Sequence, residues 1–369
     1  MNVSNASDRN AKKYNNIKLY VGISKGIISF TLLTLFLVLG FSFELEQYLS
    51  KIISNSYLIL ILYSAIIIIT AKIFFFPIEF YLEFRLEHKY GLSNQSFGKW
   101  LFEDFKGGLV GALISLPLLM VFYWTINSFQ IYWWVPFAFI TFLVSVILAQ
   151  VFPIFIMPLF YKISPIENEE LKKKIFELSK DAGLNISNIF QFDMSKNTKK
   201  ANAAFTGIGK TKRILLADTL LNNFSIDQVE TVIAHELGHY KRKHITKNII
   251  LSTINSFALF FIIAIMHSYF ISVLGFNSIS QISSFPLIVL FAVLLSLIEQ
   301  PFFNAISRKF EYEADEYAVK ATGKKEVFIA TLDYLTDNNL GDREPHPLVE
   351  WFFYSHPSLK NRVGAINNL

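Results

Sequence analysis

Long hydrophobic stretches alternate with shorter polar stretches along this chain. Charge-free runs cover residues 26–43, 107–161 and 249–298, and a further apolar segment lies near 57–80. A helix needs roughly 20 mostly apolar residues to cross a bilayer. The two longest runs each contain one weakly polar break, so each predicts a helical hairpin. We therefore predict six membrane-spanning helices, at about residues 19–43, 57–80, 107–127, 132–158, 248–273 and 284–306.

The polar segments between the spans predict a small mixed module. Residues 165–184 have the pattern of an amphipathic helix that ends near Gly183. Three short strands follow, in "NIFQFD", "NAAFTGIG" and "RILLAD". The next helix begins at a capping box formed by Ser225 and Gln228 and contains "AHELGHY". The expected fold class is a mainly α, polytopic helical membrane protein with a small α+β module.

This pattern divides the chain into four predicted parts. They are residues 1–160 with transmembrane helices 1–4 and a loop at 81–106, residues 161–247 as the module that carries the HELGH helix, residues 248–306 as a transmembrane hairpin, and residues 307–369 as a C-terminal module.

Composition and charge support a membrane protein. Of the 369 residues, 53% are hydrophobic and only 17% are charged. Basic residues gather in the N-terminal segment and in 162–247, whereas the turns at 127–131 and 272–284 are uncharged. The positive-inside rule then predicts that both termini, the loop 81–106 and the module 161–247 are cytoplasmic. The net charge of +5 follows from this topology, so no nucleic-acid partner is expected. We favour a bacterial inner membrane, or the endoplasmic reticulum membrane in a eukaryote; the sequence gives no oligomeric state.

The segment "HELGH" carries the strongest chemical signal. His235 and His239 stand at positions i and i+4, so a helix places both on one face, where they can bind one metal ion. Glu236 lies beside them as a candidate general base for a water molecule at the metal. The alternative is a polar helix face that binds no metal. The chain has no cysteine, which excludes thiolate ligands.

A third ligand is needed to complete a catalytic zinc site. A metzincin is excluded because Arg242 and Ile245 occupy the positions of its further glycine and histidine. His244 is off the helical register within "YKRKHITK" and is interpreted as a basic surface residue. "EYEAD" offers Glu311 as the third ligand and Asp315 to orient a ligating histidine. The alternative for "EYEAD" is a solvated acidic helix start.

HELGH followed by "SRKFEYEAD" resembles the Ste24-type CAAX prenyl protease 1 family of membrane zinc metalloproteases. Further similar segments are "FPIEFYLEFRLEHKYGLSNQSFGKW" at 76–100, "NAAFTG", "KRILLADTLL" and "SHPSLKNR", so the resemblance covers about residues 76–365. It implies a helical chamber and one zinc ion held by His235, His239 and Glu311, with Glu236 as the catalytic base. Eukaryotic members of this family have seven spans, one more than we predict.

The resemblance also implies roles for residues outside these motifs. His356 and Arg362 match positions that face the tetrahedral intermediate. An edge strand would pair with the substrate main chain, as in β-augmentation, through Asn202, Ala203, Ala204 and Phe205.

Four polar residues lie inside the predicted spans. Each would raise the free energy of the protein in lipid unless its side chain faces water or protein. A hydrated chamber would shelter Glu299, for which we expect a place on the cavity wall, and His267. Lys72 and Glu79 lie near a span end, where they can instead reach the interface.

We expect a zinc endopeptidase (gluzincin) that cleaves near the C-terminus of prenylated or otherwise membrane-associated substrates. Its partners would be a peptide or protein and the lipid bilayer. Two alternatives remain at this point. One is an HtpX-like protease for quality control of membrane proteins, and the other is a transporter or receptor in which HELGH is incidental.

Overall fold

The structure, a computed structural model, describes residues 2–184, 189–206 and 213–369. Six helical segments within these ranges are long and apolar enough to cross a membrane, as predicted. Their outer faces are strongly hydrophobic; Leu113, for example, is 76% exposed and Ile298 is 75% exposed. Such side chains belong in lipid. The six segments are Asp8–Val38, Ser56–Lys89, Phe97–Tyr132, Trp134–Phe160, His244–Val273 and Ile282–Thr322.

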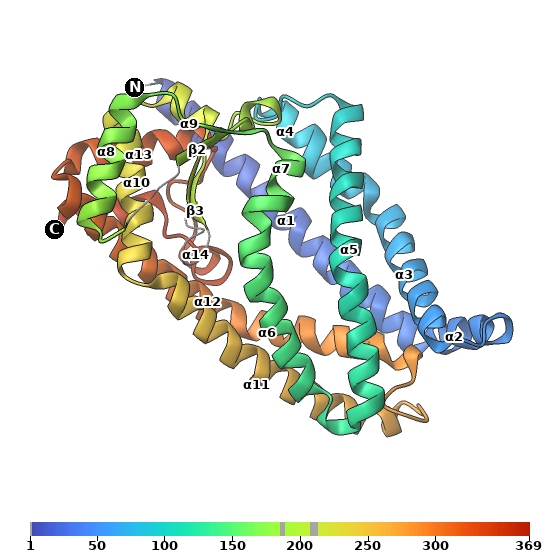
Figure 1. The fold of residues 1–369 in the computed structure, drawn as a ribbon. Helices are drawn as coiled ribbons and strands as arrows, with labels where there is room; N and C mark the ends of the chain where they lie inside the picture. Colours follow the sequence, from blue (N-terminus) through green and yellow to red (C-terminus); the bar gives the residue numbers. More distant parts are fainter. Residues whose placement is uncertain (1, 185–188, 207–212) are drawn as a thin grey trace.

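The long helices extend beyond several predicted ends (Figure 1). They are α1 (Asn2–Val38), α3 (Ser56–Glu79), α5 (Phe97–Phe129), α6 (Trp134–Val151), α11 (His244–Val273) and α12 (Phe285–Thr322). Shorter pieces continue or connect them: α2 (Phe41–Ile52), η1 (Phe80–Arg85), α4 (Leu86–Lys89), η2 (Gln130–Tyr132), η3 (Phe152–Ile156), α7 (Met157–Phe160) and η6 (Ile282–Ser284).

Two of the differences from the predicted boundaries change the path of the chain. The first span was expected to reach residue 43, but α1 ends at Val38 and Gly40 turns the chain into α2 with a left-handed φ of 81°. A glycine adopts this conformation without the steric cost that other residues meet. The expected loop 81–106 is mostly helical, because α4 continues to Lys89 and α5 begins at Phe97.

The polar module is built on a four-stranded sheet of order β1-β2-β4-β3. β2 and β4 are parallel, and the other two pairs are antiparallel. β2, β3 and β4 were predicted and β1 was not; residues 207–212 of the predicted "NAAFTGIG" strand lie outside the described ranges. The strands are β1 (Ile163–Pro165), β2 (Ile189–Phe192), β3 (Ala203–Thr206) and β4 (Arg213–Ala217).

Helices cover this sheet and form its hydrophobic core. α8 buries Leu171, Ile175 and Leu178, which recur at helical spacing, and ends before Gly183 with φ of 79°, as predicted. α10 contributes Val229, Ile233 and Leu237 to the same core. The remaining elements of the polar parts are α8 (Glu169–Asp181), η4 (Met194–Lys196), α9 (Asp218–Asn223), α10 (Ile226–Lys241), α13 (Lys325–Asn338), α14 (Pro347–Phe353) and α15 (Leu359–Asn367).

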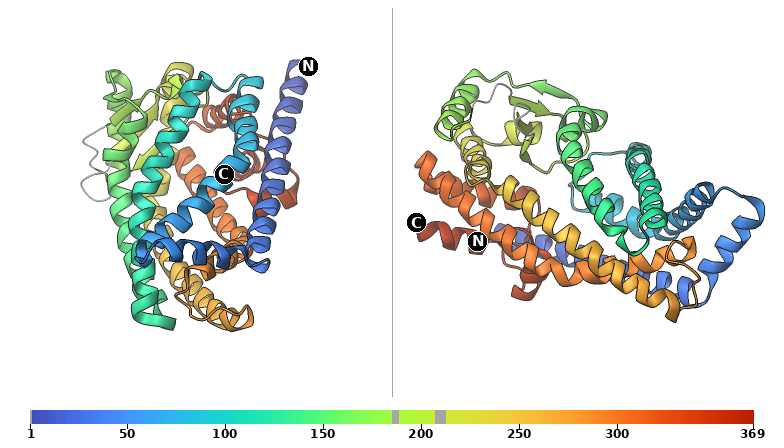
Figure 2. Two further views of the ribbon diagram at one scale, coloured as in Figure 1. Left: turned by 90° about the vertical axis from the view of Figure 1, so that its right-hand side faces the viewer. Right: turned by 60° about the horizontal axis from the view of Figure 1, so that its bottom comes forward.

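α12 connects the membrane region to the polar module without a break. It begins beside α11 in the predicted hairpin, passes residue 306 and ends at Gly323, whose φ is 65°. The acidic "EYEAD" segment is therefore the end of a membrane helix. The N-terminus lies at the same end of the molecule as the polar module (Figure 2), where Asp8 pairs with Arg343 at 2.9 Å. This arrangement agrees with six crossings that bring both termini to one side.

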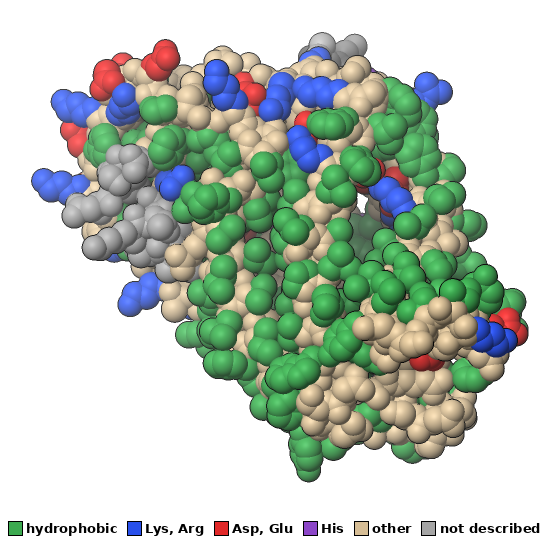
Figure 3. All heavy atoms as spheres, turned by 45° about the vertical axis from the view of Figure 1, so that its right-hand side comes forward, with side chains coloured by type: hydrophobic (Ala, Val, Ile, Leu, Met, Phe, Trp, Pro, Cys, Tyr) green, Lys and Arg blue, Asp and Glu red, His purple; other side chains and the backbone are tan. Residues whose placement is uncertain are grey.

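Four charged side chains within the spans form a network of ion pairs. Lys72 Nζ lies 2.7 Å from Glu79 Oε2 and 2.9 Å from Asp104 Oδ1, and Lys25 Nζ contacts Glu79 Oε1 at 2.7 Å. These ion pairs join α1, α3 and α5. On the face drawn in Figure 3, hydrophobic side chains predominate, and an opening between the helices lies beside basic and acidic side chains.

His267 and Glu299 also have partners. His267, 1% exposed, lies within hydrogen-bond distance of Ser284 Oγ, at 3.0 Å, and is packed in protein. Asn255 Nδ2 on α11 donates to Glu299 Oε2 on α12 at 2.9 Å. A place for Glu299 on a cavity wall stays a prediction.

Candidate active site

α10 presents the two histidines of HELGH from a well-anchored helix. Its first turn has the predicted capping box, in which Ser225 Oγ accepts from the Gln228 N–H and the Gln228 side chain accepts from the Ser225 N–H. One face of α10 packs on the sheet core, so the opposite face projects His235 and His239 toward α12. The helix ends at Lys241, directly after the motif.

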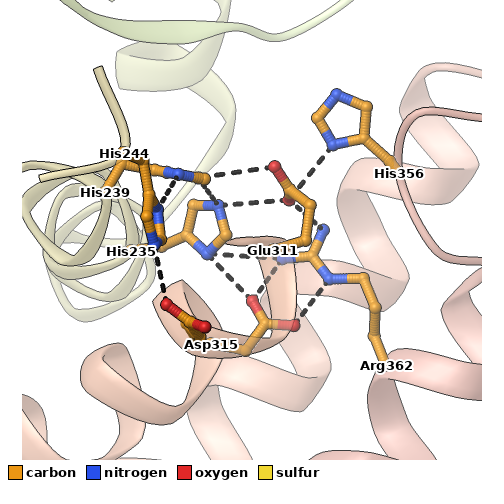
Figure 4. Close-up of polar contacts among 8 residues, drawn as sticks. His235, His239, His244, Glu311, Asp315, His356 and Arg362 are labelled. Atoms are coloured by element: carbon orange, nitrogen blue, oxygen red, sulfur yellow. Dashed lines mark hydrogen bonds and ion pairs between the residues drawn. The ribbon is translucent and has the colours of Figure 1, made fainter. Parts of the chain in front are cut away.

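Gly238 of the motif allows α12 to approach closely. A Cβ atom at this position would lie 2.9 Å from Ala314 Cα and 3.0 Å from Ala314 O. Both distances are shorter than ordinary van der Waals contact, so only glycine fits without movement. The close crossing places Glu311, one turn before Ala314, opposite the two histidines (Figure 4).

His235, His239 and Glu311 form a three-residue cluster whose ligand atoms all lie within 4.8 Å of one another. The two Nε2 atoms are 3.2 Å apart, and each lies 3.4 Å from a different oxygen of Glu311. Glu311 is 4% exposed, and its Oε2 makes no hydrogen bond of good geometry within the described residues, although His356 Nδ1 lies 3.1 Å away. A buried carboxylate that faces two imidazole nitrogens fits a metal ion.

Asp315 and Arg362 support the cluster from behind. His235 Nδ1 lies 2.8 Å from Asp315 Oδ1, and Asp315 accepts two hydrogen bonds from Arg362, from Nε at 2.8 Å and Nη2 at 2.5 Å. Burial disfavours a charged imidazole, but the hydrogen bonds to Asp315 and Glu311 outweigh it and raise the pKa of His235 to about 9. The site is therefore electrostatically suited to a positive charge.

The cluster opens into a pocket of about 470 Å³. Glu236 and Arg362 line it together with His235, and His356 reaches Glu311 Oε2 with Nδ1 at 3.1 Å from a side chain that is 67% exposed. The guanidinium of Arg362 is mainly engaged with Asp315, and its Nη1 lies 3.9 Å from Glu311 Oε2. The pocket thus gathers the predicted base Glu236, two of the three predicted ligands (His235 and Glu311), and His356 and Arg362 of "SHPSLKNR".

The predicted substrate strand is at the edge of the sheet. Among the strands that the structure describes, β3 pairs only with β4, in the order β1-β2-β4-β3. Asn202 and Ala203 line the pocket, Ala204 pairs with Leu215, and Phe205 pairs with Ile214. An unpaired strand edge beside a pocket can accept an extended peptide.

The interpretation of His244 as a surface residue is wrong. Its side chain is 2% exposed and contacts His239 and Glu313. Lys243 takes a left-handed φ of 58° between α10 and α11. This turn in the chain brings the His244 side chain into contact with His239. His244 follows His239 by five residues, a spacing that does not match one continuous helix. This spacing was the only sequence feature that could have pointed to a role for His244.

Sequence comparisons match the whole chain to known families. The description "Peptidase family M48" matches residues 165–369, and "CAAX prenyl protease N-terminal, five membrane helices" matches residues 2–162. Four helices of spanning length, and the short α2, lie within that N-terminal part.

Individual proteins of known sequence or structure are also similar to this chain. CAAX prenyl protease 1 of Saccharomyces cerevisiae is 34% identical over 79% of this chain and 68% of its own length. The uncharacterized metalloprotease YhfN of Bacillus subtilis is 28% identical over 96% of this chain and 84% of its own. The crystal structure of S. mikatae Ste24p matches with a TM-score of 0.87 and 27% identity, over 98% of this chain and 89% of that one.

These similarities confirm the predicted family and do not favour the alternatives of a quality-control protease or a transporter. The M48 family also implies a metal cofactor, which agrees with the cluster of two histidines and one glutamate. This chain belongs to peptidase family M48 and is an integral-membrane metalloprotease of the CAAX prenyl protease 1 type.

Proposed function

We propose that His235, His239 and Glu311 hold one zinc ion and that Glu236 is the catalytic base of peptide-bond hydrolysis. The observation that supports this most directly is the convergence of the two Nε2 atoms on the buried carboxylate of Glu311, each 3.4 Å from a different oxygen. Two histidines and one glutamate are a ligand set of catalytic zinc sites, which keep one position open. When bound, zinc would polarise the scissile carbonyl and lower the pKa of the nucleophilic water.

The chain's own residues supply the proton transfers and the orientation. Glu236, in the pocket beside the cluster, takes a proton from the attacking water and delivers it to the leaving amine. His356 donates a hydrogen bond to the oxyanion that develops on the scissile carbonyl. Arg362 adds positive charge there and holds Asp315, which orients His235.

The substrate is a peptide that enters in an extended conformation along β3. The edge strand formed by Asn202, Ala203, Ala204 and Phe205 gives affinity through its outward-facing main-chain groups, with little demand on side chains. We propose a C-terminal segment carrying a prenyl group, because this lipid places the scissile bond near the membrane helices. The names of the yeast and human relatives, CAAX prenyl protease 1 and its homolog, support this substrate class.

The membrane setting follows the same reasoning. The lysine-rich polar module lies on the cytoplasmic side by the positive-inside rule, and the four predicted parts act as membrane anchor, catalytic module, hairpin and ligand-bearing C-terminal module. A bacterial cytoplasmic membrane is favoured by the near full-length match to the Bacillus subtilis relative.

The test is cleavage of a farnesylated CaaX peptide by purified, zinc-loaded full-length protein. We expect hydrolysis after the prenylated cysteine. Glu236→Gln should lower it by about 10²–10⁴-fold while zinc still binds, because only the general base is lost. A chelator should abolish it, and zinc should restore it. Cleavage of only unprenylated membrane peptides would remove the prenyl specificity, and hydrolysis that is unaffected by Glu236→Gln would contradict the assignment of the base.

A further inference from the structure

His244 is buried against one of the proposed zinc ligands. Its Nδ1 lies 2.9 Å from His239 Nδ1, and its Nε2 lies 2.9 Å from Glu313 Oε2 (Figure 4). The imidazole stacks on the Phe310 ring, with centroids 4.1 Å apart and an angle of 9° between the planes. Both nitrogens of a 2% exposed side chain are therefore used, and its ring cannot turn freely.

When both imidazoles are neutral, these contacts permit one arrangement of protons. The Glu313 carboxylate only accepts, so His244 Nε2–H must donate to it. In a neutral imidazole the other nitrogen is then an acceptor, so His244 Nδ1 receives the proton of His239 Nδ1–H. His239 is left with a free lone pair on Nε2, the atom that faces Glu311.

His235, the other proposed histidine ligand, is oriented by a different hydrogen bond. His235 Nδ1–H points to Asp315, which Arg362 holds from α15. Without His244, His239 would have no corresponding hydrogen bond to its Nδ1 among the bonds that the structure describes. The sequence predicted that Asp315 orients a ligating histidine. It did not predict that His244 orients His239.

We infer that His244 and Glu313 are positioning residues that fix the ring orientation and the Nδ1–H tautomer of His239, so that its Nε2 is available to the metal. This inference rests on the proposed zinc site. His244 is the first residue of membrane helix α11, so this helix contacts the proposed metal ligand His239 directly. Outer hydrogen-bond partners of this kind typically change metal affinity by about 10–100-fold when they are removed.

The experiment measures zinc affinity of the full-length protein in detergent, by competition with a chromophoric chelator. His244→Phe keeps an aromatic ring on Phe310 and removes both nitrogens, and Glu313→Gln removes the charge at a side chain that is 24% exposed. We expect affinity to fall by about 10–100-fold in His244→Phe and by less in Glu313→Gln. The matched control, Glu316→Gln on the next turn of α12, contacts Arg242 and Lys320 and should bind like wild type.

A second measurement separates positioning from packing. The visible absorption of the cobalt-substituted protein reports ligand geometry, and it should shift in His244→Phe and Glu313→Gln but not in Glu316→Gln. Wild-type zinc affinity and an unchanged cobalt spectrum in the folded His244→Phe protein would overturn the inference while the proposed function stands. A wild-type protein that binds no zinc at all would contradict the proposed function and this inference together.

Discussion

A Cβ atom added to Gly238 would lie 2.9 Å from the Cα of Ala314, so the backbones of α10 and α12 touch where they cross. This contact sets the distance between the two histidines of α10 and Glu311 of α12. A helix-helix separation this small leaves room for no side chain at the crossing, because both the Cα and the carbonyl oxygen of Ala314 are in the way.

We therefore predict that Gly238→Ala impairs the metal site. In an open helix the same change would stabilise by roughly 0.5–1 kcal/mol. Here α12 must move away, and overpacking of this kind costs about 1–3 kcal/mol. Thermal unfolding should begin at a lower temperature, and zinc should bind at least about tenfold more weakly, since about 1.4 kcal/mol is a factor of ten.

The control for this change is Gly364→Ala. Gly364 also lies within a helix, α15, but an added Cβ would meet nothing within 4 Å. Its stability should be equal to or above that of wild type. Equal zinc affinity in Gly238→Ala and wild type would show that the crossing does not control the ligand geometry.

Arg362→Lys tests whether Arg362 acts through Asp315 as well as on the substrate. Arginine makes two hydrogen bonds to Asp315, and a lysine cannot reproduce this fork. We expect zinc affinity to fall by about tenfold and kcat/KM to fall further. Lys360→Met, on the same helix but 63% exposed, should leave both unchanged. A loss of kcat/KM with wild-type zinc affinity would show that Arg362 acts on the substrate and not through Asp315.

Much of this architecture could be predicted because it depends on local sequence patterns. The spans follow from runs of apolar residues, and α10 follows from its capping box and its helical spacing of Val229, Ile233 and Leu237. The spacing of His235 and His239 fixes their common face regardless of the rest of the fold. A sequence pattern of period 3.6 carries this information directly.

The missed features depend on single backbone conformations or on distant contacts. Lys243 adopts φ of 58°, which periodicity does not reveal, and this one turn converts His244 from a surface residue into a buried partner of His239. Likewise, nothing local in α1 indicates that Asn15 would contact Leu340, 325 positions later.

This contact makes the N-terminal helix part of the pocket wall. Asn15 Nδ2 donates to Leu340 O at 2.7 Å, where Leu340 has a left-handed φ of 49°, and Asn15, Asn339 and Asp342 line the pocket. Asn15→Ala removes a hydrogen bond worth about 1 kcal/mol that holds this turn. We expect KM to rise by a factor of about five, as that energy implies, with kcat little changed.

Steady-state kinetics with a fluorogenic peptide measure this effect. Asn10→Ala, at an exposed position on the same helix, should behave like wild type. A fall in kcat at constant KM would indicate that Asn15 acts on the chemical step, which its position away from the ligand cluster does not predict.

The last prediction concerns the open edge of β3. Ala217 N–H donates to Asn202 O at 3.0 Å, so the antiparallel ladder bonds Asn202 and Ala204 to β4 and leaves Ala203 between them facing outward. The N–H of Ala203 is then available to a substrate strand. Ala203→Pro deletes this donor without deleting a bond to β4, and proline is tolerated at such edge positions. We expect kcat/KM to fall by about tenfold, with zinc affinity unchanged, because one substrate hydrogen bond is lost. Ala203→Ser keeps the N–H and should retain activity. If Ala203→Pro cleaves peptide as well as Ala203→Ser does, the substrate does not pair with β3 at this residue.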